Sequence, residues 1–248
     1  MRIAGIVYPA DYFKLHLPDE IFRAEAEAFA QQGFNIFTLD HSGLRPAPES
    51  GLRYLYRGWM LSLAQYRQMY ADWSRQGVLP LVTPEDYALC HYLPNWYSLL
   101  QAYTPETHRI GFDDDLVAFL SALRAEGWSE FFLKDDVKSL KTGLGSRLRE
   151  PEQGVRWLQE MRQFRSELEG GVCIRRVEDW LSETEERWFV WRGQAFGPQF
   201  DASSPGQQVI PEPVQAACEV INSPFFSVDI VKNRADQWRL VELGDGQV

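Results

Sequence analysis

The stretches FFSVDIV (Phe225–Val231) and WRLVELGDGQV (Trp238–Val248) close the chain, and both have the apolar, β-branched character of paired strands. Asp229 lies in the middle of the first stretch, and Glu242 lies late in the second. An even number of loop residues between the strands would place both carboxylates on one face as close neighbours. Two carboxylates that close repel each other unless they share a proton or a cation.

Magnesium suits such a pair, because Mg²⁺ prefers oxygen ligands and often takes one or two carboxylates together with substrate phosphates. The hairpin alone leaves a second interpretation open. Both carboxylates could point into solvent, or Arg239 or Lys232 could pair with one of them.

The composition excludes several classes of protein. The 248 residues, 45% of them hydrophobic and 24% charged, suffice for one large domain or for two to three lobes. The formal charge of −10 argues against binding to nucleic acid, whose phosphates require a basic surface. We find neither a signal peptide nor an apolar run of about 18 residues, and the three cysteines lack paired spacing. We therefore expect a cytoplasmic protein without a membrane partner.

A strand–helix–strand unit is predicted at the start of the chain, from strands at 2–8 and 34–39 and a helix at 21–32 that Gly33 ends. Such a unit builds a parallel sheet, so the fold class is expected to be α/β at first. The segment 41–51 has the composition of a linker. The C-terminal part is expected to be α+β, with mostly antiparallel strands.

Further elements follow from periodicity and from capping residues. Strands are predicted at 53–57, 78–82, 130–134, 172–177, 187–192 and 195–200. Helices are predicted at 62–76, from Thr83 onward, and at 94–103, 113–126, 152–167 and 211–221.

Three segments carry the residues of a phosphate or nucleotide site. Lys134 ends an apolar strand, and a basic loop with Lys141 and two glycines follows it, so point charge and backbone N–H groups could meet a phosphate there. Further on, Val177 and Glu178 end another strand, where a carboxylate could accept ribose hydroxyls. Arg187 lies on an extended segment and could touch phosphate.

Each of these segments also has a plainer interpretation. The basic loop could simply be solvated, and Arg187, which Glu185 would orient toward a phosphate, could instead form a cross-strand surface ion pair. The acidic run at 113–115 is best explained as a helix N-terminus. The sequence shows no HExxH, GxSxG, Walker A or GxGxxG motif, which argues against a zinc or serine hydrolase.

The order of these features resembles the ATP-grasp superfamily. In detail, YRGWM (Tyr56–Met60), HYLPNWY (His91–Tyr97), FFLKDDVKS (Phe131–Ser139) and the final VELGDGQV are similar to the R2K clade of ATP-grasp proteins, family 3. The resemblance implies three lobes. A Rossmann-like lobe would span 1–92, a central lobe 93–178 and a C-terminal lobe 179–248, with the last two clamping ATP.

The resemblance also implies roles for individual residues. Lys134, Lys141 and Arg187 match phosphate-contacting positions, and Val177 and Glu178 match the adenine and ribose hinge. Asp229 and Glu242 match Mg²⁺ ligands. Arg57, Trp59 and His91 are candidates for the acceptor site.

The sequence departs from the family pattern at two places. Lys134 is followed by two aspartates where most ATP-grasp enzymes have a proline and a longer glycine-rich flap. Gly244 stands where common members have the asparagine of a Glu-x-Asn metal motif. Asp245, Gln247 or water would then have to supply the missing metal ligand.

The reaction that the resemblance implies is ATP- and Mg²⁺-dependent ligation of a carboxylate to an amine through an acylphosphate. Both substrates would be small molecules or peptides. Two alternatives remain, a phosphotransferase on the same scaffold and a nucleotide-binding module without ligase activity.

Overall fold

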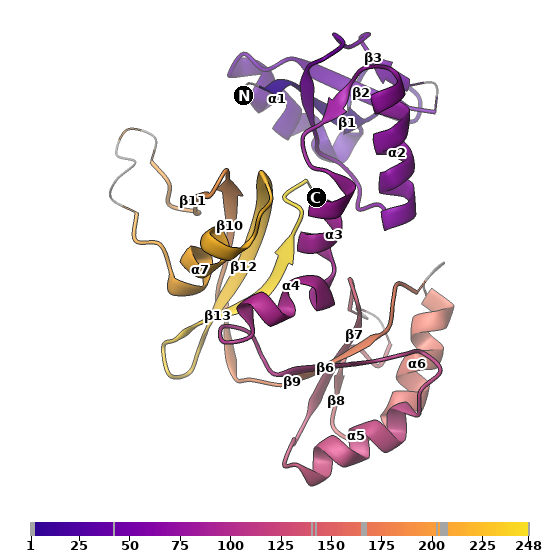
Figure 1. The fold of residues 1–248 in the computed structure, drawn as a ribbon, viewed down its shortest axis with the longest axis vertical. Helices are drawn as coiled ribbons and strands as arrows, with labels where there is room; N and C mark the ends of the chain where they lie inside the picture. Colours follow the sequence, from indigo (N-terminus) through magenta and orange to yellow (C-terminus); the bar gives the residue numbers. More distant parts are fainter. Residues whose placement is uncertain are drawn as a thin grey trace.

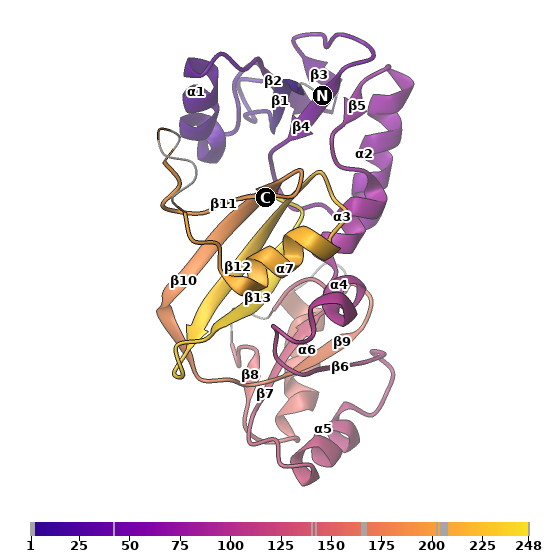
Figure 2. The ribbon, with the colours of Figure 1, turned by 60° about the vertical axis from the view of Figure 1, so that its left-hand side comes forward.

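The structure, a computed structural model, describes residues 3–41, 43–139, 141, 143–164, 168–201, 203 and 208–247. They form three sheets spread along the long axis of the molecule, with the N-terminal sheet at one end, the C-terminal sheet in the middle and the central sheet at the other end (Figure 1). The end of the chain lies beside helix α3 (Pro84–His91), beneath the N-terminal sheet (Figures 1 and 2).

The N-terminal sheet has the strand order β3-β2-β1-β4-β5 and is parallel except for β3. The predicted strand–helix–strand unit is confirmed. The segment expected to be only a linker contains β3, which pairs with β2 as an antiparallel edge strand. The elements of this part are β1 (Ile3–Pro9), η1 (Glu20–Phe22), α1 (Arg23–Gln31), β2 (Ile36–Asp40), β3 (Gly43–Arg45), β4 (Arg53–Tyr56), α2 (Leu63–Arg75) and β5 (Leu79–Pro80).

Side-chain caps fix the starts of two helices near the sheet. Ser62 and Gln65 form a capping box at α2, and Thr83 and Asp86 form another at α3, as the sequence predicts for Thr83. These caps satisfy backbone N–H groups that would otherwise lack partners.

The central sheet has the strand order β6-β9-β7-β8 and is antiparallel. Its elements are β6 (Thr107–Ile110), α5 (Leu116–Ala125), β7 (Phe131–Asp135), β8 (Arg147–Leu148), α6 (Gln153–Phe164) and β9 (Val172–Arg176). Phe131, Leu133 and Ile174 pack with side chains of α5 and α6 in one buried cluster. Because side chains alternate along a strand, Lys134, Cys173 and Arg175 face the other way.

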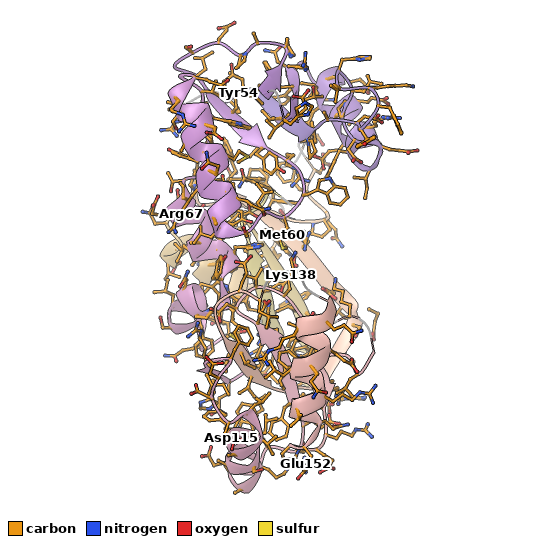
Figure 3. The ribbon with its side chains drawn as sticks, turned by 90° about the vertical axis from the view of Figure 1, so that its right-hand side faces the viewer. Tyr54, Met60, Arg67, Asp115, Lys138 and Glu152 are labelled. Atoms are coloured by element: carbon orange, nitrogen blue, oxygen red, sulfur yellow. The ribbon has the colours of Figure 1, made fainter. Side chains whose placement is uncertain are left out.

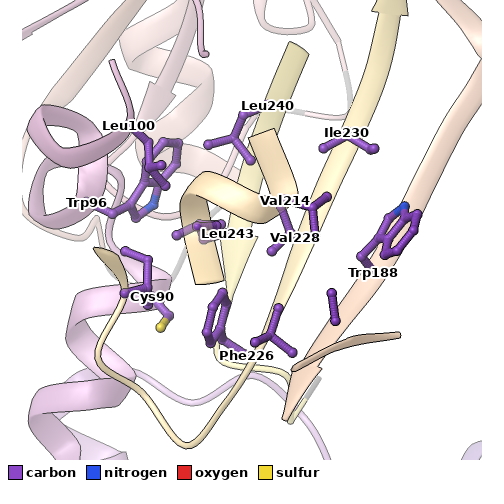
Figure 4. Close-up of a cluster of buried hydrophobic side chains, with 14 of the residues drawn as sticks. Cys90, Trp96, Leu100, Trp188, Val214, Phe226, Val228, Ile230, Leu240 and Leu243 are labelled. Atoms are coloured by element: carbon purple, nitrogen blue, oxygen red, sulfur yellow. The ribbon is translucent and has the colours of Figure 1, made fainter. Parts of the chain in front are cut away.

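The C-terminal sheet has the strand order β11-β10-β12-β13. Its elements are β10 (Trp180–Trp191), β11 (Gln194–Phe196), α7 (Glu212–Val220), β12 (Phe225–Asn233) and β13 (Trp238–Gly244). One face packs on α7, α3 and α4 (Leu93–Leu100), through side chains such as Val228, Leu243 and Trp96 (Figure 4). We call this the core face, and the opposite face of β10, β12 and β13 the cleft face.

Besides β3, two more strands escaped the sequence prediction. The strands β6 and β8 are short, and both contain charged residues, so their pattern is weak. The strand β10 also begins earlier than expected, at Trp180. The lobe limits at residues 92 and 178 remain a prediction.

Candidate nucleotide and metal site

Asp229 and Glu242 lie directly opposite each other on β12 and β13. The shared face is confirmed, but the reason differs from the one expected. The last strand pair, Lys232 and Trp238, encloses five residues, an odd number, and would leave Glu242 on the core face. A β-bulge at Val241 shifts the register by one residue and brings Glu242 onto the cleft face.

Arg187 holds Asp229 from the neighbouring strand. The two residues are paired across β10 and β12, and the guanidinium donates to both carboxylate oxygens, Nε to Oδ1 and Nη2 to Oδ2, each at 2.7 Å. This pair raises the pKa of Arg187. The cross-strand ion pair that the sequence left open is therefore present and bidentate, and the residue that orients Arg187 is Asp229 rather than Glu185.

Lys134 reaches across from the central sheet to Glu242. Its Nζ lies 3.2 Å from Glu242 Oε2, and the lysine is only 4% exposed. Burial would raise the pKa of Glu242, but the cations Lys134, Arg175 and Arg187 together hold it below its usual value. Burial lowers the pKa of Lys134, against the attraction of Glu242. The carboxylate therefore stays ionised between the two sheets.

Arg175 is a further cation of the site, and sequence reasoning missed it. The guanidinium donates to Val241 O at 2.8 Å and to Thr104 Oγ1 at 2.6 Å, while its Nε is buried without a partner among the described residues. Burial lowers the pKa of Arg175 to about 10 although the charge of Glu242 raises it. Two cations, Lys134 and Arg175, thus surround Glu242, an arrangement that favours an anionic ligand. The only signal in the sequence was a polar residue facing away from the α5–α6 cluster in an otherwise buried strand.

His91 ends α3 and lies against the same charges. It is 7% exposed, its ring packs on Tyr87 at 4.9 Å, and its Nε2 is buried with no hydrogen-bond partner that the structure describes. Burial lowers the pKa of His91 to about 4, against the attraction of Glu242. The imidazole is therefore neutral at physiological pH.

The predicted hinge lies at the other end of the sheet. Glu178 accepts two hydrogen bonds from Arg239, both at 2.8 Å, and one from Trp180 Nε1 at 3.2 Å. Val177 precedes it and is half-buried. The sequence allowed Arg239 to pair with Asp229 or Glu242, but in the structure Arg239 pairs with Glu178.

The two aspartates after Lys134 have structural partners. Asp135 is buried and accepts hydrogen bonds from the backbone N–H groups of Val137 and Lys138, and Asp136 is paired with Arg109 at 2.8 and 2.9 Å. They fix the turn that leads into the basic loop. Lys138 lies on the loop above α6 (Figure 3), and Lys141 is exposed. The structure does not bring Lys141 to the carboxylates.

Arg57, Trp59 and Asp245 lie at the junction with the N-terminal sheet. Arg57 is paired with Glu25 at 2.9 and 2.7 Å and donates to Gly246 O at 2.7 Å. Trp59 is half-exposed. Asp245 is fully buried, and burial raises its pKa to about 6. The structure therefore joins Lys134, Arg187, Asp229 and Glu242 through ion pairs and strand pairing, with His91 beside their charges, whereas the side chain of Asp245 is hydrogen-bonded to Gln247.

The donor set fits a magnesium ion that shares its ligands with a substrate. Among the described residues, no group of three or more His, Cys, Asp or Glu side chains is placed to hold a metal. The pair Asp229 and Glu242 offers oxygen atoms only, as Mg²⁺ requires. Each carboxylate oxygen accepts more than one bond, so the arginine and lysine contacts leave acceptor positions free.

Comparison with known protein families identifies the family of this chain. Residues 125–248, half of the chain, match the ATP-grasp domain of R2K clade family 3. The chain belongs to this family. All of the predicted clamp residues from Lys134 onward lie within the matched half.

Solved structures extend the likeness of this ATP-grasp protein over its whole length. D-alanyl-alanine synthetase A from Vibrio cholerae has a TM-score of 0.65 at 10% identity, covering 99% of this chain and 90% of that one. A RimK domain ATP-grasp protein from Sphaerobacter thermophilus gives 0.63 at 14% identity, covering 99% and 92%. The ATP-grasp ligase PsnB, complexed with its minimal precursor, Mg and ADP, gives 0.58 at 11% identity, covering 100% and 91%. The predicted ATP-grasp fold is thereby confirmed.

A search of curated proteins finds no match. None of the helices that the structure describes has the length and apolar character needed to span a bilayer.

Proposed function

We propose that this protein is an ATP- and Mg²⁺-dependent carboxylate–amine ligase that works through an acylphosphate. The central observation is that two cation–carboxylate pairs, Lys134–Glu242 and Arg187–Asp229, meet between the central and C-terminal sheets. The two cations suit a triphosphate, and the two carboxylates suit the metal that accompanies it.

The chain's own residues would first exchange partners. Lys134 and Arg187 move their charge from the carboxylates to the phosphate oxygens, and Arg175 adds a buried positive charge beside them. Asp229 and Glu242, released, hold the metal. The backbone at Val177 would meet adenine, and Glu178 would accept the ribose hydroxyls on the outer side of its pair with Arg239. Lys141 would come to the phosphates only if the basic loop moves.

Two bond exchanges would complete the reaction. An oxygen of the substrate carboxylate attacks the γ-phosphorus, and the bond from that phosphorus to the oxygen that leaves with ADP breaks. The amine then attacks the acyl carbon, inorganic phosphate leaves with the bonding electrons, and the amine loses a proton. Bound Mg²⁺ supplies charge neutralisation for the transferring phosphoryl group. Lys134 and Arg187 stabilise the same negative charge, and the sheets exclude water from it.

The solved neighbours support a ligase rather than another use of the fold. They include a D-alanyl-alanine synthetase, a D-cycloserine synthetase and an ATP-grasp ligase complexed with its minimal precursor. We propose an amino acid or a peptide as carboxylate and a second amino acid or peptide as amine. Residues 1–92 would form the acceptor-side lobe with Arg57, Trp59 and His91, and residues 93–178 and 179–248 the two halves of the clamp.

An ADP-release screen tests this proposal. Wild-type protein with Mg²⁺ and ATP is incubated with pairs of amino acids and dipeptides, and products are identified by mass. We expect ADP, phosphate and an amide in equal amounts for the accepted pair. ADP with a phosphorylated product and no amide would indicate a phosphotransferase. Tight nucleotide binding without any ADP release would indicate a binding module.

A further inference from the structure

The strand pair next to the two carboxylates consists of Ser227 and Gly244. These residues lie directly opposite each other on β12 and β13, two residues along from Asp229 and Glu242. Because side chains alternate, both positions lie on the cleft face with the carboxylates. Any oxygen at this pair would belong to the same site.

Asp245 and Gln247, the side chains expected to replace the missing asparagine, point elsewhere. Gln247 Nε2 donates to Asp245 Oδ2 at 2.7 Å and lies 3.1 Å from the hydroxyl of Tyr66. The backbone of Gln247 accepts from Gly58 N at 3.0 Å. The Gln247 side chain therefore faces α2 and Asp245 is bonded to it, while Gly244 itself offers no side-chain oxygen beside Glu242.

Ser227 fills the space of that missing side chain. It is only 3% exposed, and its hydroxyl donates no hydrogen bond to the residues that the structure describes. A Cβ built on Gly244 would lie 2.6 Å from Ser227 Oγ but 4.0 Å from Ser227 Cβ. The backbone of Gly244 is not in the left-handed region, so the Ser227 hydroxyl is what a side chain at this position would meet first. A side chain on β13 would therefore displace the Ser227 hydroxyl from its present position.

We propose that the Ser227 hydroxyl takes the place of the asparagine and holds a water molecule of the Mg²⁺ that Asp229 and Glu242 bind. This inference rests on the proposed function. Serine is too short to reach the metal itself, because two residues along a strand cover about 6.6 Å. A metal–water bond of about 2.1 Å, followed by a hydrogen bond of about 2.8 Å from the water to Ser227 Oγ, would bridge the gap between the hydroxyl and the metal. Ser227 is then a positioning residue of the metal site.

Variants that move the side-chain oxygen from position 227 on β12 to position 244 on β13 test the proposed role of Ser227 directly. The variants are Ser227→Ala, Gly244→Asn and the double variant Ser227→Gly with Gly244→Asn. Ser223→Ala serves as control, because Ser223 is also buried but donates to Phe225 O at 3.1 Å on the chain just before β12. The probe is Mn²⁺, which takes the same oxygen ligands, with a non-hydrolysable ATP analogue. Its affinity is measured by calorimetry and electron spin resonance, and its bound waters by proton relaxation.

We expect Ser227→Ala to weaken Mn²⁺ binding to the nucleotide complex about tenfold, the usual effect of losing an outer-shell partner. Gly244→Asn alone should weaken it also, whereas the double variant should restore it and show one bound water fewer. Ser223→Ala should match wild type. If either single variant fails to fold, the water count of the double variant still decides.

Two results separate the two proposals. Equal Mn²⁺ affinity in wild type and Ser227→Ala, or an unchanged water count in the folded double variant, would overturn the role of Ser227 alone. A wild-type protein that binds no Mn²⁺–nucleotide complex at all would overturn the proposed function.

Discussion

The core face and the cleft face of β12 and β13 are built from alternating residues of the same two strands. The core face presents the buried side chains of Phe226, Val228 and Leu243 to the helices. The cleft face presents Asp229 and Glu242 to cations from other strands. Side chains that stabilise the fold therefore alternate along each strand with side chains of the candidate site. A substitution on the core face should lower stability and spare turnover, and a substitution on the cleft face should do the reverse.

Loss of a large side chain on the core face should have the largest effect. Phe226→Ala empties a fully buried site and should lower the free energy of unfolding by about 3–5 kcal/mol, through lost burial and a cavity. Denaturant unfolding measures it. Phe189→Ala, on the cleft face where the ring is only half-buried, should lose less. Equal losses would break the distinction between the faces.

Loss of a charge on the cleft face should affect turnover instead. Asp229→Asn removes a proposed metal carboxylate and should reduce ADP release about 100- to 1,000-fold, as when other transition-state contacts are removed. Its unfolding midpoint should change little. Glu185→Gln, an exposed acid two residues from Arg187, is the control and should retain turnover. Retained turnover in Asp229→Asn would remove Asp229 from the site.

A smaller effect is expected at Lys134, the cation that we propose contacts the nucleotide. Lys134→Met keeps the length of the side chain but removes its charge, and should weaken binding of an ATP analogue about tenfold or more, since a charged hydrogen bond contributes about 1.5–3 kcal/mol. Calorimetry measures the affinity. Lys232→Met removes an ion pair with Asp236 at the hairpin turn and should leave affinity unchanged. Comparable losses in both variants would indicate a nonspecific charge effect.

The contribution of His91 to the free energy of unfolding should depend on pH. Its folded pKa of about 4 lies below the ordinary 6.5 because burial disfavours the cation, so the unfolded chain takes up a proton first as the pH falls. Stability from this group is therefore lost on acidification below 6.5. Between pH 7 and 5.5 the loss should be about 1 kcal/mol. Comparing unfolding of wild type and His91→Gln isolates it, and parallel pH curves for the two would contradict the assignment.

The sequence predicts the elements well where apolar residues repeat, and less well where contacts are distant. The strands of the closing hairpin follow from FFSVDIV and WRLVEL, and the caps at Thr83 and Asp115 follow from local chemistry. The bulge at Val241 and the approach of Arg175 to Glu242 are set by packing between sheets, which no local pattern encodes. The hydrogen bonds that tie Asp245 to Gln247, and Gln247 to Tyr66 of α2, depend on the same kind of distant contact, and the metal role expected for Asp245 stays a prediction.

A crystal structure with a non-hydrolysable ATP analogue and Mg²⁺ tests the central claim most directly. We predict the analogue between the central and C-terminal sheets, with Lys134 and Arg187 on its phosphates and the metal on Asp229 and Glu242. A bound analogue elsewhere, with the Lys134–Glu242 and Arg187–Asp229 pairs intact, would contradict it.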